Sequence, residues 1–237
     1  MNLRNSIALV TGAGRGIGKA IALGLAREGA TILLTARTVP ELEAVKKEVE
    51  AKGGIAFVLP ADVTRDGDIE NLFQEISTRF QRLDILVNNA GLGVFAAVRD
   101  LAVSDFDRMW SLNVRAVMVC TQHALKIMEP QNDGAIVNVA SLAGRNAFIG
   151  GAGYAATKWA LIGFARSLMF EVRQHNIRVV TICPGSVDTS FSSTAKDPSR
   201  SASILHSEDI ADTVIAALKL PDRAMVSEID IRPTNPQ

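Results

Sequence analysis

Two side chains in the segment 141–160 are spaced so that they can do chemistry together. The segment reads SLAGRNAFIGGAGYAATKWA, and Tyr154 and Lys158 are separated by three residues within it. Apolar residues recur after Tyr154 at spacings of three, four and seven, and this periodicity predicts a helix from Gly153 onward. Residues four apart on a helix share one face, so the phenol and the ammonium group are expected to point into one pocket.

Such a pair is suited to proton transfer. A phenol ordinarily has a pKa of about 10, and a neighbouring cation favours the phenolate and lowers that pKa. Tyr154 beside Lys158 is therefore predicted to give or take a proton near neutral pH. Ser141 ends the apolar run 136–140, which predicts a buried strand, and its hydroxyl could hydrogen-bond a substrate oxygen. Alone, Tyr-x-x-x-Lys is more typical of an ordinary helix face, so its weight comes from the residues before it.

A glycine-rich turn stands near the start of the chain. Residues 6–10 predict a short strand, residues 11–18 read TGAGRGIG, and an Ala- and Leu-rich helical pattern follows. Gly12, Gly16 and Gly18 would permit a tight turn and a close approach of the backbone to a pyrophosphate, with the helix N-terminus facing the negative charge. Strand, glycine turn and helix in this order predict a dinucleotide site.

The end of the second predicted strand, 31–36, bears on the choice of cofactor. In dinucleotide-binding folds an acidic residue about 20 positions after the glycines binds the ribose 2′-hydroxyl, whereas an arginine accommodates a 2′-phosphate. This chain has Arg37 there. Arg15, inside the glycine turn, could stack on the adenine or contact the same phosphate. The two arginines favour NADP over NAD, unless both are solvated surface side chains.

Polar residues follow the next two predicted strands. Asp62 comes just after strand 55–59, where its carboxylate either bonds the adenine amino group or caps the following helix. The sequence NNAG at 88–91 ends strand 83–87. Its asparagines either tie neighbouring strands together or form a simple turn, and its glycine lets the backbone lie against a flat ligand.

Two further features lie in the second half of the chain. Asn113 is polar in the apolar middle of a helix predicted over 105–129, where its side chain bonds backbone or water, or makes no bond. A sixth strand is predicted at 178–183. The polar, Ser/Thr-rich segment 186–206 follows it, and a long loop in a compact domain is usually functional or disordered. Its place after a strand end suits a substrate loop.

Length and composition fit one α/β domain over residues 1–237. With 25 basic and 25 acidic residues the net charge is zero, so we expect neither a nucleic-acid nor a membrane-surface partner. Cys120 and Cys183 lie in apolar runs and are expected to be buried and reduced, and the spacing of the chain's residues predicts no metal site. We find neither a signal-peptide pattern nor an apolar run of about 18 residues, so a cytoplasmic protein is expected.

Alternating strands and helices predict an α/β fold, with a doubly wound parallel sheet of about seven strands and helices on both faces. Ligands of open α/β sheets bind at the carboxyl ends of the strands. Gly12, Asp62, Asn89, Ser141 and Pro184 all fall at or just past such ends. One crevice is therefore expected to collect every motif.

Taken together, these motifs resemble the short-chain dehydrogenase/reductase family. TGAGRGIG matches that family's T-G-x-x-x-G-x-G, NNAG matches its N-N-A-G, and Pro184-Gly185 with Thr189 matches its P-G-x-x-x-T. The four catalytic positions of the family are matched in order and spacing by Asn113, Ser141, Tyr154 and Lys158. The resemblance covers nearly the whole chain.

The resemblance implies a single-domain Rossmann fold and hydride transfer at the nicotinamide C4. Tyr154 would transfer the proton, Lys158 would hold the nicotinamide ribose and lower the tyrosine pKa, and Ser141 would orient the carbonyl. Asn113 would position a water between Lys158 and solvent. The residues expected to bind NADP(H) are Gly12, Arg15, Gly16, Ile17, Gly18, Arg37, Asp62 at the adenine, Val63, Asn89, Ala90, Gly91, Tyr154, Lys158, Pro184, Gly185, Val187, and Thr189 at the carboxamide.

In similar enzymes the helices around 104–129 and 152–174 pack between subunits, so a homotetramer or homodimer is expected. The likeness is greatest to bacterial NADP-dependent ketoreductases, including 3-oxoacyl-carrier-protein reductases. Residues 129–133, EPQND, stand where those reductases tend to carry a basic docking patch, and 226–233, VSEIDIRP, has no Asp-Gly-Gly ending. The expected substrate is therefore a small ketone, aldehyde or hydroxy acid.

Other functions remain open at this point. One is an acyl-thioester reductase, and another is a cofactor-binding regulator without catalysis, which the intact Ser, Tyr and Lys disfavour. A sugar-nucleotide epimerase or dehydratase is disfavoured because its T-G-x-x-G-x-x-G and larger C-terminal region are missing. The candidate substrate walls are 92–95, 142–148 and 186–206. Arg145, in the second wall, either anchors a substrate carboxylate or is a surface arginine.

Overall fold

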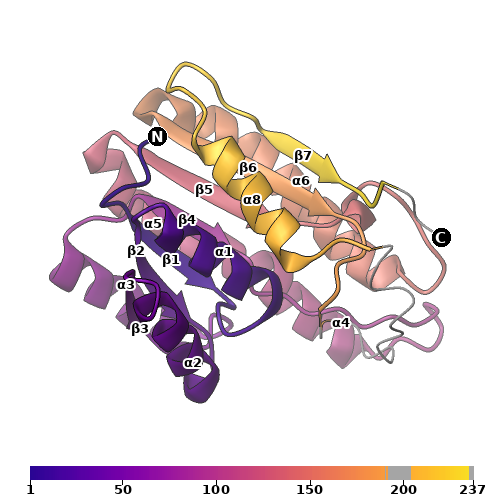
Figure 1. The fold of residues 1–237 in the computed structure, drawn as a ribbon. Coiled ribbons are helices and arrows are strands. Elements are labelled where there is room, and N and C mark those ends of the chain that lie inside the picture. The colour runs from indigo at the N-terminus through magenta and orange to yellow at the C-terminus, as the bar shows by residue number, and fades with distance from the viewer. Residues whose placement is uncertain (190, 192–203, 235–237) are drawn as a thin grey trace.

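A single parallel sheet of seven strands runs through the protein, in the order β3-β2-β1-β4-β5-β6-β7 (Figure 1). The computed structural model describes residues 1–189, 191 and 204–234. The strands are β1 (Ile7–Thr11), β2 (Thr31–Thr35), β3 (Ile55–Val58), β4 (Ile85–Asn88), β5 (Gly134–Val139), β6 (Ile177–Pro184) and β7 (Glu228–Ile231). The chain order reverses between β1 and β4, which creates the switch point at which such sheets bind ligands. The predicted fold class is confirmed.

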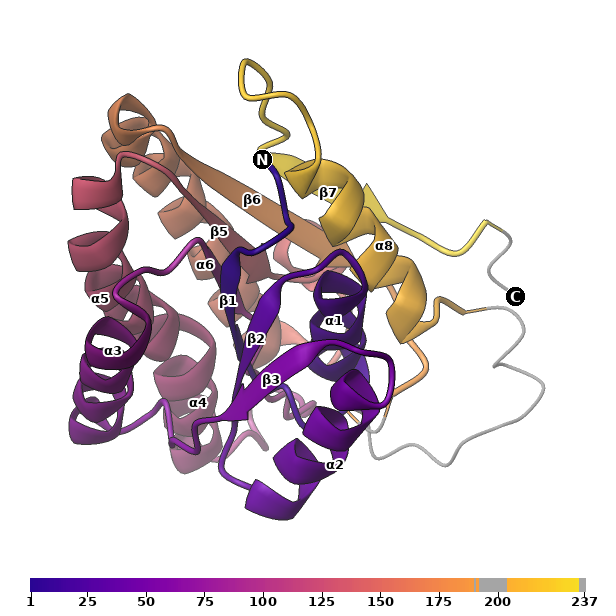
Figure 2. The ribbon, with the colours of Figure 1, turned by 60° about the vertical axis from the view of Figure 1, so that its left-hand side comes forward.

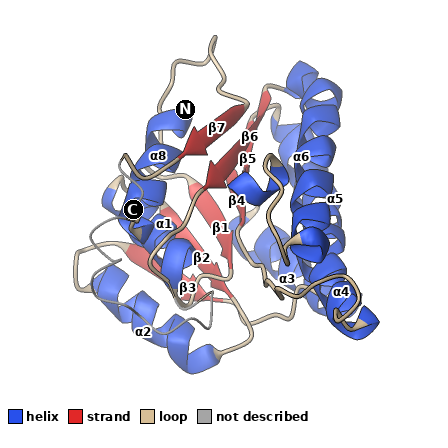
Figure 3. Ribbon diagram, turned by 90° about the vertical axis from the view of Figure 1, so that its right-hand side faces the viewer, coloured by secondary structure: helices blue, strands red, loops and turns tan. Residues whose placement is uncertain are grey.

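Helices cover both faces of the sheet, as Figures 2 and 3 show. One face carries α1 (Gly16–Arg27), α2 (Val39–Glu50) and α8 (Ser207–Leu218), and the other carries α3 (Asp66–Phe80), α4 (Val103–Trp110), α5 (Ala116–Gln131) and α6 (Ala152–Val172). Short 3₁₀ turns occupy Leu142–Gly144 and Arg173–His175. Helices α1 and α8 approach closely at Gly24, where a Cβ would lie 2.8 Å from the Cδ1 of Ile215. The sequence thus places a small residue where two helices meet.

The central strands are apolar throughout because both faces of the sheet are covered. Every residue of β5 and of β6 is buried. The helices bury one stripe each, as in α2, where Leu42, Val45 and Val49 recur at spacings of three and four and face the sheet as their spacing predicts. Cys120 and Cys183 are buried free thiols, as predicted.

The helix predicted over 105–129 is present, with one departure. A π-helical turn, Ser111–Arg115, joins α4 to α5, and Asn113 lies inside it. A π turn adds one residue to a helical turn and changes which side chains face inward. Asn113 is buried within this turn, at 1% exposure. A pattern of period 3.6 cannot reveal a single turn of a different period, so the departure was not predicted.

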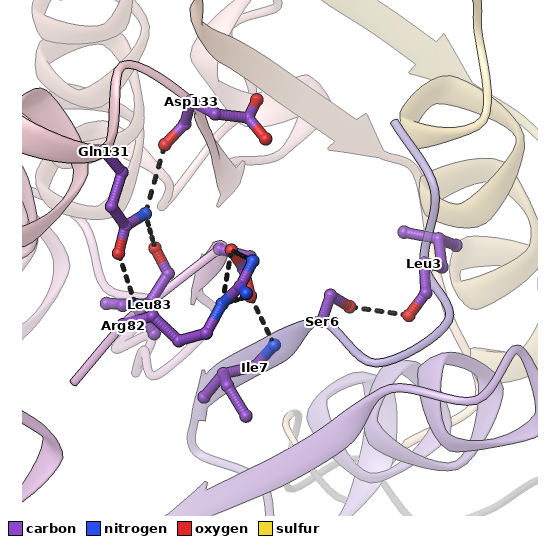
Figure 4. A network of polar contacts seen from close by, with 8 residues as sticks. Leu3, Ser6, Ile7, Arg82, Leu83, Gln131 and Asp133 are labelled. Atoms are coloured by element: carbon purple, nitrogen blue, oxygen red, sulfur yellow. Dashed lines mark hydrogen bonds and ion pairs between the residues drawn. The ribbon is translucent and has the colours of Figure 1, made fainter. Parts of the chain in front are cut away.

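A network of polar contacts links the amino ends of β1 and β4, at the edge of the sheet opposite the carboxyl ends of the strands (Figure 4). The carboxylate of Asp84 accepts hydrogen bonds from the backbone N–H of Ile7, at 2.7 Å, and from Arg82, also at 2.7 Å. The Gln131 side chain bonds both the N–H and the carbonyl of Leu83, each at 2.9 Å. A buried carboxylate is tolerated when it is paired in this way, so this network holds strands in register.

The expected substrate loop, 186–206, lies only partly within the described residues, because residues 190 and 192–203 fall outside them. Its two ends do pair with each other. The N–H of Asp188 donates to the carbonyl of Leu205 at 2.8 Å, and the N–H of Leu205 donates to Ser186 at 3.0 Å. These bonds hold both ends of the segment beside the carboxyl end of β6. Its role at the substrate stays a prediction.

Candidate active site

A cavity of about 1650 Å³ opens at the carboxyl ends of the strands. Nearly all the site residues that were predicted from the sequence line this cavity. The predicted residues that line it are Gly12, Arg15, Gly16, Ile17, Arg37, Asp62, Val63, Asn89, Ala90, Gly91, Ser141, Tyr154, Lys158, Pro184, Gly185, Val187 and Thr189. Gly18 and Asn113 are not among the lining residues. Both lie directly behind the wall, where they support residues that do line it.

The glycine turn between β1 and α1 needs its glycines for different reasons. Gly12 and Gly16 have φ angles of 63° and 54°, in the left-handed region that favours glycine. At Gly18 a Cβ would lie 2.3 Å from the Gly12 carbonyl oxygen, so this glycine lets the helix pack onto the turn. Helix α1 begins with neither a side-chain cap nor an acidic residue in its first turn. Its first N–H groups and the positive end of its dipole are thus available to an anion.

The two asparagines of NNAG do tie strands together, and the alternative of a simple turn is wrong. Asn89 donates through Nδ2 to the carbonyls of Thr11, at 2.9 Å, and Gly12, at 3.2 Å. The Thr11 hydroxyl in turn accepts the backbone N–H groups of Asn89 and Ala90. Asn88 donates to Asn138 at 3.0 Å, which joins β4 to β5. These bonds fix the glycine turn against the cavity floor.

Two arginines and a glutamate lie at the end of the cavity next to β2. Arg15 and Arg37 are both exposed, and Glu41 lines the same wall. The Nη1 of Arg15 lies 4.0 Å from a carboxylate oxygen of Glu41, and the Arg15 side chain is 70% exposed. An exposed pair at that distance contributes little free energy, so Arg15 is available to an anionic ligand at small cost.

Asp62 does not cap the following helix, which corrects one of the two alternatives. Helix α3 has Arg65 at its N-cap position. Instead, the carboxylate of Asp62 accepts hydrogen bonds from the N–H of Thr64 at 3.0 Å and from its hydroxyl at 2.7 Å. Burial opposes ionisation, but the Thr64 bonds and the charges of Arg37 and Arg65 together lower the pKa of Asp62. An ionised acceptor is therefore held at the cavity wall.

Ser141, Tyr154 and Lys158 come together as predicted, at the carboxyl end of β5. Helix α6 places Tyr154 and Lys158 on one buried face, at 7% and 5% exposure. The Ser141 side chain is near enough to the Tyr154 phenol to act on its pKa, and its hydroxyl oxygen accepts the N–H of Ala143 at 3.1 Å. The Lys158 Nζ donates to the carbonyl of Val139 at 3.0 Å and lies 5.7 Å from the centre of the Tyr154 ring.

The protonation of this pair differs from the sequence-based expectation. Burial raises the pKa of Tyr154 to about 12, against the opposing effect of the hydrogen bond with Ser141. Burial also lowers the pKa of Lys158 to about 8. The prediction that Lys158 lowers the tyrosine pKa is thus wrong for this structure. Burial is the main effect on the Tyr154 pKa, and the Lys158 ammonium group bonds the Val139 carbonyl rather than the phenol oxygen.

Asn113 acts through protein contacts that the sequence left open. Its Oδ1 accepts the N–H of Leu92 at 2.9 Å, and its Nδ2 donates to the Leu92 carbonyl at 2.9 Å and to the Thr157 hydroxyl at 3.0 Å. Thr157 precedes Lys158, so the amide joins the loop after β4 to the helix that carries the lysine. A water-positioning role for Asn113 stays a prediction.

Neither alternative for Arg145 is correct. The guanidinium forms ion pairs with the carboxylates of Glu228 and Asp230 on β7. Glu228 is bound in addition by Arg166 at 2.6 Å. Arg145 is therefore a half-buried structural cation that joins the loop after β5 to β7, and it is not available to anchor a substrate carboxylate. Its partners lie more than eighty residues away in sequence, so no local spacing could have indicated them.

Three phenyl rings at the cavity were not singled out from the sequence. Phe95 and Phe148 lie in the expected substrate walls 92–95 and 142–148, and Phe191 lies in the third wall. They line the cavity near Tyr154, whose ring centre is 5.3 Å from that of Phe95 and 5.9 Å from that of Phe191. The rings come from three separate loops, so their meeting depends on the topology alone.

Comparison with known proteins agrees with this geometry. The family model described as short chain dehydrogenase matches residues 6–199. The chain belongs to the short-chain dehydrogenase/reductase family. Within that family, a sepiapterin reductase of Chlorobaculum tepidum is 35% identical over 236 residues, covering 97% of this chain and 96% of the relative. The protein is accordingly an oxidoreductase of this family.

Solved structures of the family share the whole fold. A metagenomic short-chain oxidoreductase in complex with NADP has a TM-score of 0.87 and 35% identity, over 99% of both chains. An alcohol dehydrogenase from the archaeon Thermococcus sibiricus, complexed with 5-hydroxy-NADP, has a TM-score of 0.91 and 31% identity, again over 99% of both. In the described part of this chain, no helix is long and apolar enough to cross a membrane. Within the same residues, no cluster of His, Cys, Asp or Glu could hold a metal ion.

Proposed function

We propose that the protein is an NADP(H)-dependent carbonyl reductase that acts on a small ketone, aldehyde or hydroxy acid, with Tyr154 as general acid and base. One observation carries this proposal. Ser141, Tyr154 and Lys158, the last two four residues apart on α6, line the same cavity as the glycine turn at the N-terminus of α1. Proton transfer and dinucleotide binding can therefore occur side by side.

The residues present fit a phosphorylated dinucleotide. The uncapped N-terminus of α1 suits a pyrophosphate, and Arg15 and Arg37 suit a 2′-phosphate at the β2 end of the cavity. Family members with whole-chain similarity bind NADP or a hydroxy-NADP. The cofactor-binding residues proposed from the sequence keep that role here, with Gly18 acting through the packing of α1 onto the turn. When bound, NADPH supplies the hydride.

The protein's own part is to deliver a proton to the carbonyl oxygen. With a pKa of about 12, Tyr154 carries its proton at neutral pH and is ready to donate it during reduction. Ser141, beside the same phenol, orients the substrate oxygen toward it. Lys158, with a pKa of about 8, is largely cationic at pH 7, and we assign it to hold the nicotinamide ribose. In the reverse direction the phenolate accepts the alcohol proton.

The two other candidate functions have less support. An acyl-carrier-protein reductase would need a basic docking surface, and residues 129–133 carry no lysine or arginine. A catalytically inactive regulator would have no need for a buried lysine beside a buried tyrosine, because burying an ionisable group costs free energy. The intact Ser141, Tyr154 and Lys158, of which the last two are buried, favour an enzyme.

We also propose that the protein is a homotetramer or homodimer in the cytoplasm. Helices α5 and α6, which correspond to the helices that pack between subunits in similar enzymes, expose large apolar side chains. Met118 on α5 is 41% exposed, and Trp159 and Phe170 on α6 are 55% and 61% exposed. Exposed apolar groups of this size commonly mark interaction surfaces. Size-exclusion chromatography with light scattering measures the assembly directly.

The test of the proposed activity is consumption of NADPH, followed by absorbance, with a panel of carbonyl compounds. The panel holds small ketones, aldehydes, 2-oxo and 3-oxo acids and a 3-oxoacyl thioester, and each is repeated with NADH. We expect turnover of a free carbonyl compound and a preference for NADPH. Faster turnover of the thioester would favour the acyl-thioester alternative. Absence of turnover, with NADPH binding confirmed by fluorescence, would favour the regulator.

A further inference from the structure

The substrate end of the cavity is formed by a run of aromatic rings. Phe95 lies 5.3 Å from Tyr154 between ring centres, with an angle of 74° between the planes, which is an edge-to-face contact. Phe148 lies 5.9 Å from Phe95, and Phe191 lies 5.9 Å from Tyr154. Three of the nine phenylalanines in the chain are thus gathered around its single tyrosine. All three line the cavity. We call Phe95, Phe148 and Phe191 the aromatic box.

The rings of the aromatic box are not buried in the hydrophobic core. Phe95 and Phe148 are each 46% exposed and Phe191 is 44% exposed, whereas the core phenylalanine Phe73 is 3% exposed. Large apolar groups that stay exposed together in a concave site mark a place where a ligand removes them from water. Since they stand beside the proton donor, the ligand is the reacting substrate.

At two glycines the absence of a side chain lets these rings pack directly against the backbone. A Cβ on Gly93 would lie 3.0 Å from the rings of both Phe95 and Phe191. A Cβ on Gly151 would lie 2.3 Å from the Phe148 ring, although the φ of Gly151 is −96° and any residue can adopt it. The chain therefore keeps space for the rings at positions where the backbone itself does not need glycine. This is a second observation, independent of the ring exposure.

Charge at this end of the cavity does not favour an anionic substrate. Arg145 is held by carboxylates on β7, Arg108 pairs with Asp105 at 2.9 Å, and Arg232 pairs with Asp230 at 3.3 Å. The cations Arg15 and Arg37 lie with the glycine turn and β2, at the other end. A substrate carboxylate near Tyr154 would therefore meet an acidic side chain beside each of these arginines, although the exposed pairs of Arg108 and Arg232 are themselves weak.

We infer that the preferred substrates are uncharged carbonyl compounds that carry a flat aryl or heteroaryl group next to the carbonyl, and that Phe95 and Phe148 determine this specificity. The inference deepens the proposed carbonyl reductase and rests on it. Aromatic pairs gain about 0.5–1.5 kcal/mol beyond the burial of area, which corresponds to about two- to thirteenfold in kcat/KM when one such contact forms in the transition state. A puckered aliphatic ring of the same carbon number gains the area but not this contact.

The test is a comparison of kcat/KM, with NADPH, for acetophenone and cyclohexyl methyl ketone. These two ketones have the same number of carbon atoms and differ in the flatness of the ring and in its conjugation with the carbonyl, so the change in their ratio between the natural protein and the variants is the decisive readout. Benzoylformate has a carboxylate in place of the methyl group of acetophenone. In the natural protein we expect a preference of about two- to thirteenfold for acetophenone over the cyclohexyl ketone, and a lower kcat/KM for benzoylformate than for acetophenone.

Three variants locate the source of the preference. Phe95→Leu and Phe148→Leu keep an apolar wall and should bring the aryl preference close to one. Gly151→Ala displaces the Phe148 ring without removing it and should weaken the preference in the same direction. The matched control is Phe80→Leu, because Phe80 also makes an edge-to-face pair, with Phe57, but does not line the cavity. It should leave the preference unchanged.

The outcomes separate this inference from the proposed function. Equal kcat/KM for the two ketones, or a preference that survives Phe95→Leu and Phe148→Leu, would overturn the inference while the reductase activity stands. A benzoylformate rate above that of acetophenone would overturn the uncharged-substrate part. If no carbonyl compound is reduced by protein that binds NADPH, the proposed function and the inference fail together.

Discussion

Replacing Lys158 by methionine should abolish turnover and yet stabilise the folded protein. The lysine is 5% exposed, and its Nζ has one hydrogen bond, to the Val139 carbonyl at 3.0 Å. Methionine has a similar length and no charge, so the substitution removes the ammonium without leaving a large cavity. A group that is held in place for chemistry at the expense of stability is expected at an active site.

The size of the effect follows from the lysine pKa. Burial lowers that pKa from 10.5 to about 8, a shift that corresponds to about 3 kcal/mol of unfolding free energy lost at pH 7. The variant also loses the hydrogen bond to Val139, which lowers its unfolding free energy by about 1 kcal/mol. The net gain in unfolding free energy for Lys158→Met is therefore about 2 kcal/mol. Between pH 8 and 10.5 the unfolded chain binds the proton more tightly, so the natural protein gains stability as pH rises. At pH 10 the two proteins should be about equally stable.

The assay is urea denaturation of both proteins, without cofactor, at pH 7 and pH 10. In thermal unfolding at pH 7 the gain should appear as a Tm higher by about 4–8 °C. Lys52→Met, at an exposed lysine, is the control and should change neither value. A Lys158→Met protein that is less stable than the natural one at pH 7, or a difference that does not shrink toward pH 10, would refute the reasoning.

Two other predictions concern the cofactor and the tyrosine. Arg37→Asp should shift the cofactor preference from NADPH toward NADH, because the carboxylate repels a 2′-phosphate and accepts a hydrogen bond from a 2′-hydroxyl. The ratio of kcat/KM for the two cofactors measures this preference. An unchanged ratio would assign the recognition of the 2′-phosphate to Arg15. Tyr154 is the single tyrosine, so tyrosinate absorbance reports on it alone. Because burial raises its pKa from 10 to about 12, the folded protein should ionise about two pH units later than the protein in guanidinium, and folding stability should fall as pH rises above 10. Coincident titrations would show that the phenol is not buried.

Much of the fold and of the site could be predicted because the signals are local. Alternating apolar strands and amphipathic helices determine a parallel sheet, and the carboxyl ends of parallel strands meet at one edge. Gly12 at the end of β1, Asn89 after β4 and Ser141 after β5 therefore had to lie together. The spacing of Tyr154 and Lys158 on one helix likewise placed both side chains in the same cavity.

What could not be predicted depends on contacts between distant segments or on burial. The partners of Arg145 lie on β7, and only the pairing of β6 with β7 brings them near. The pKa of Tyr154 lies above the expected value because burial, which a sequence does not reveal, raises it, and burial likewise lowers the pKa of Lys158. The aromatic box is assembled from three loops and has no spacing of its own.

The most direct test of the central claim compares the natural protein with Tyr154→Phe. Carbonyl-dependent oxidation of NADPH and the fluorescence of bound NADPH are measured on both proteins. The substitution removes the proton donor and no proposed phosphate contact, so turnover should fall by about 10²–10⁴-fold while NADPH affinity stays within about twofold. Turnover equal to that of the natural protein would show that Tyr154 is not the general acid, and loss of NADPH binding would show that its place in the site has been misassigned.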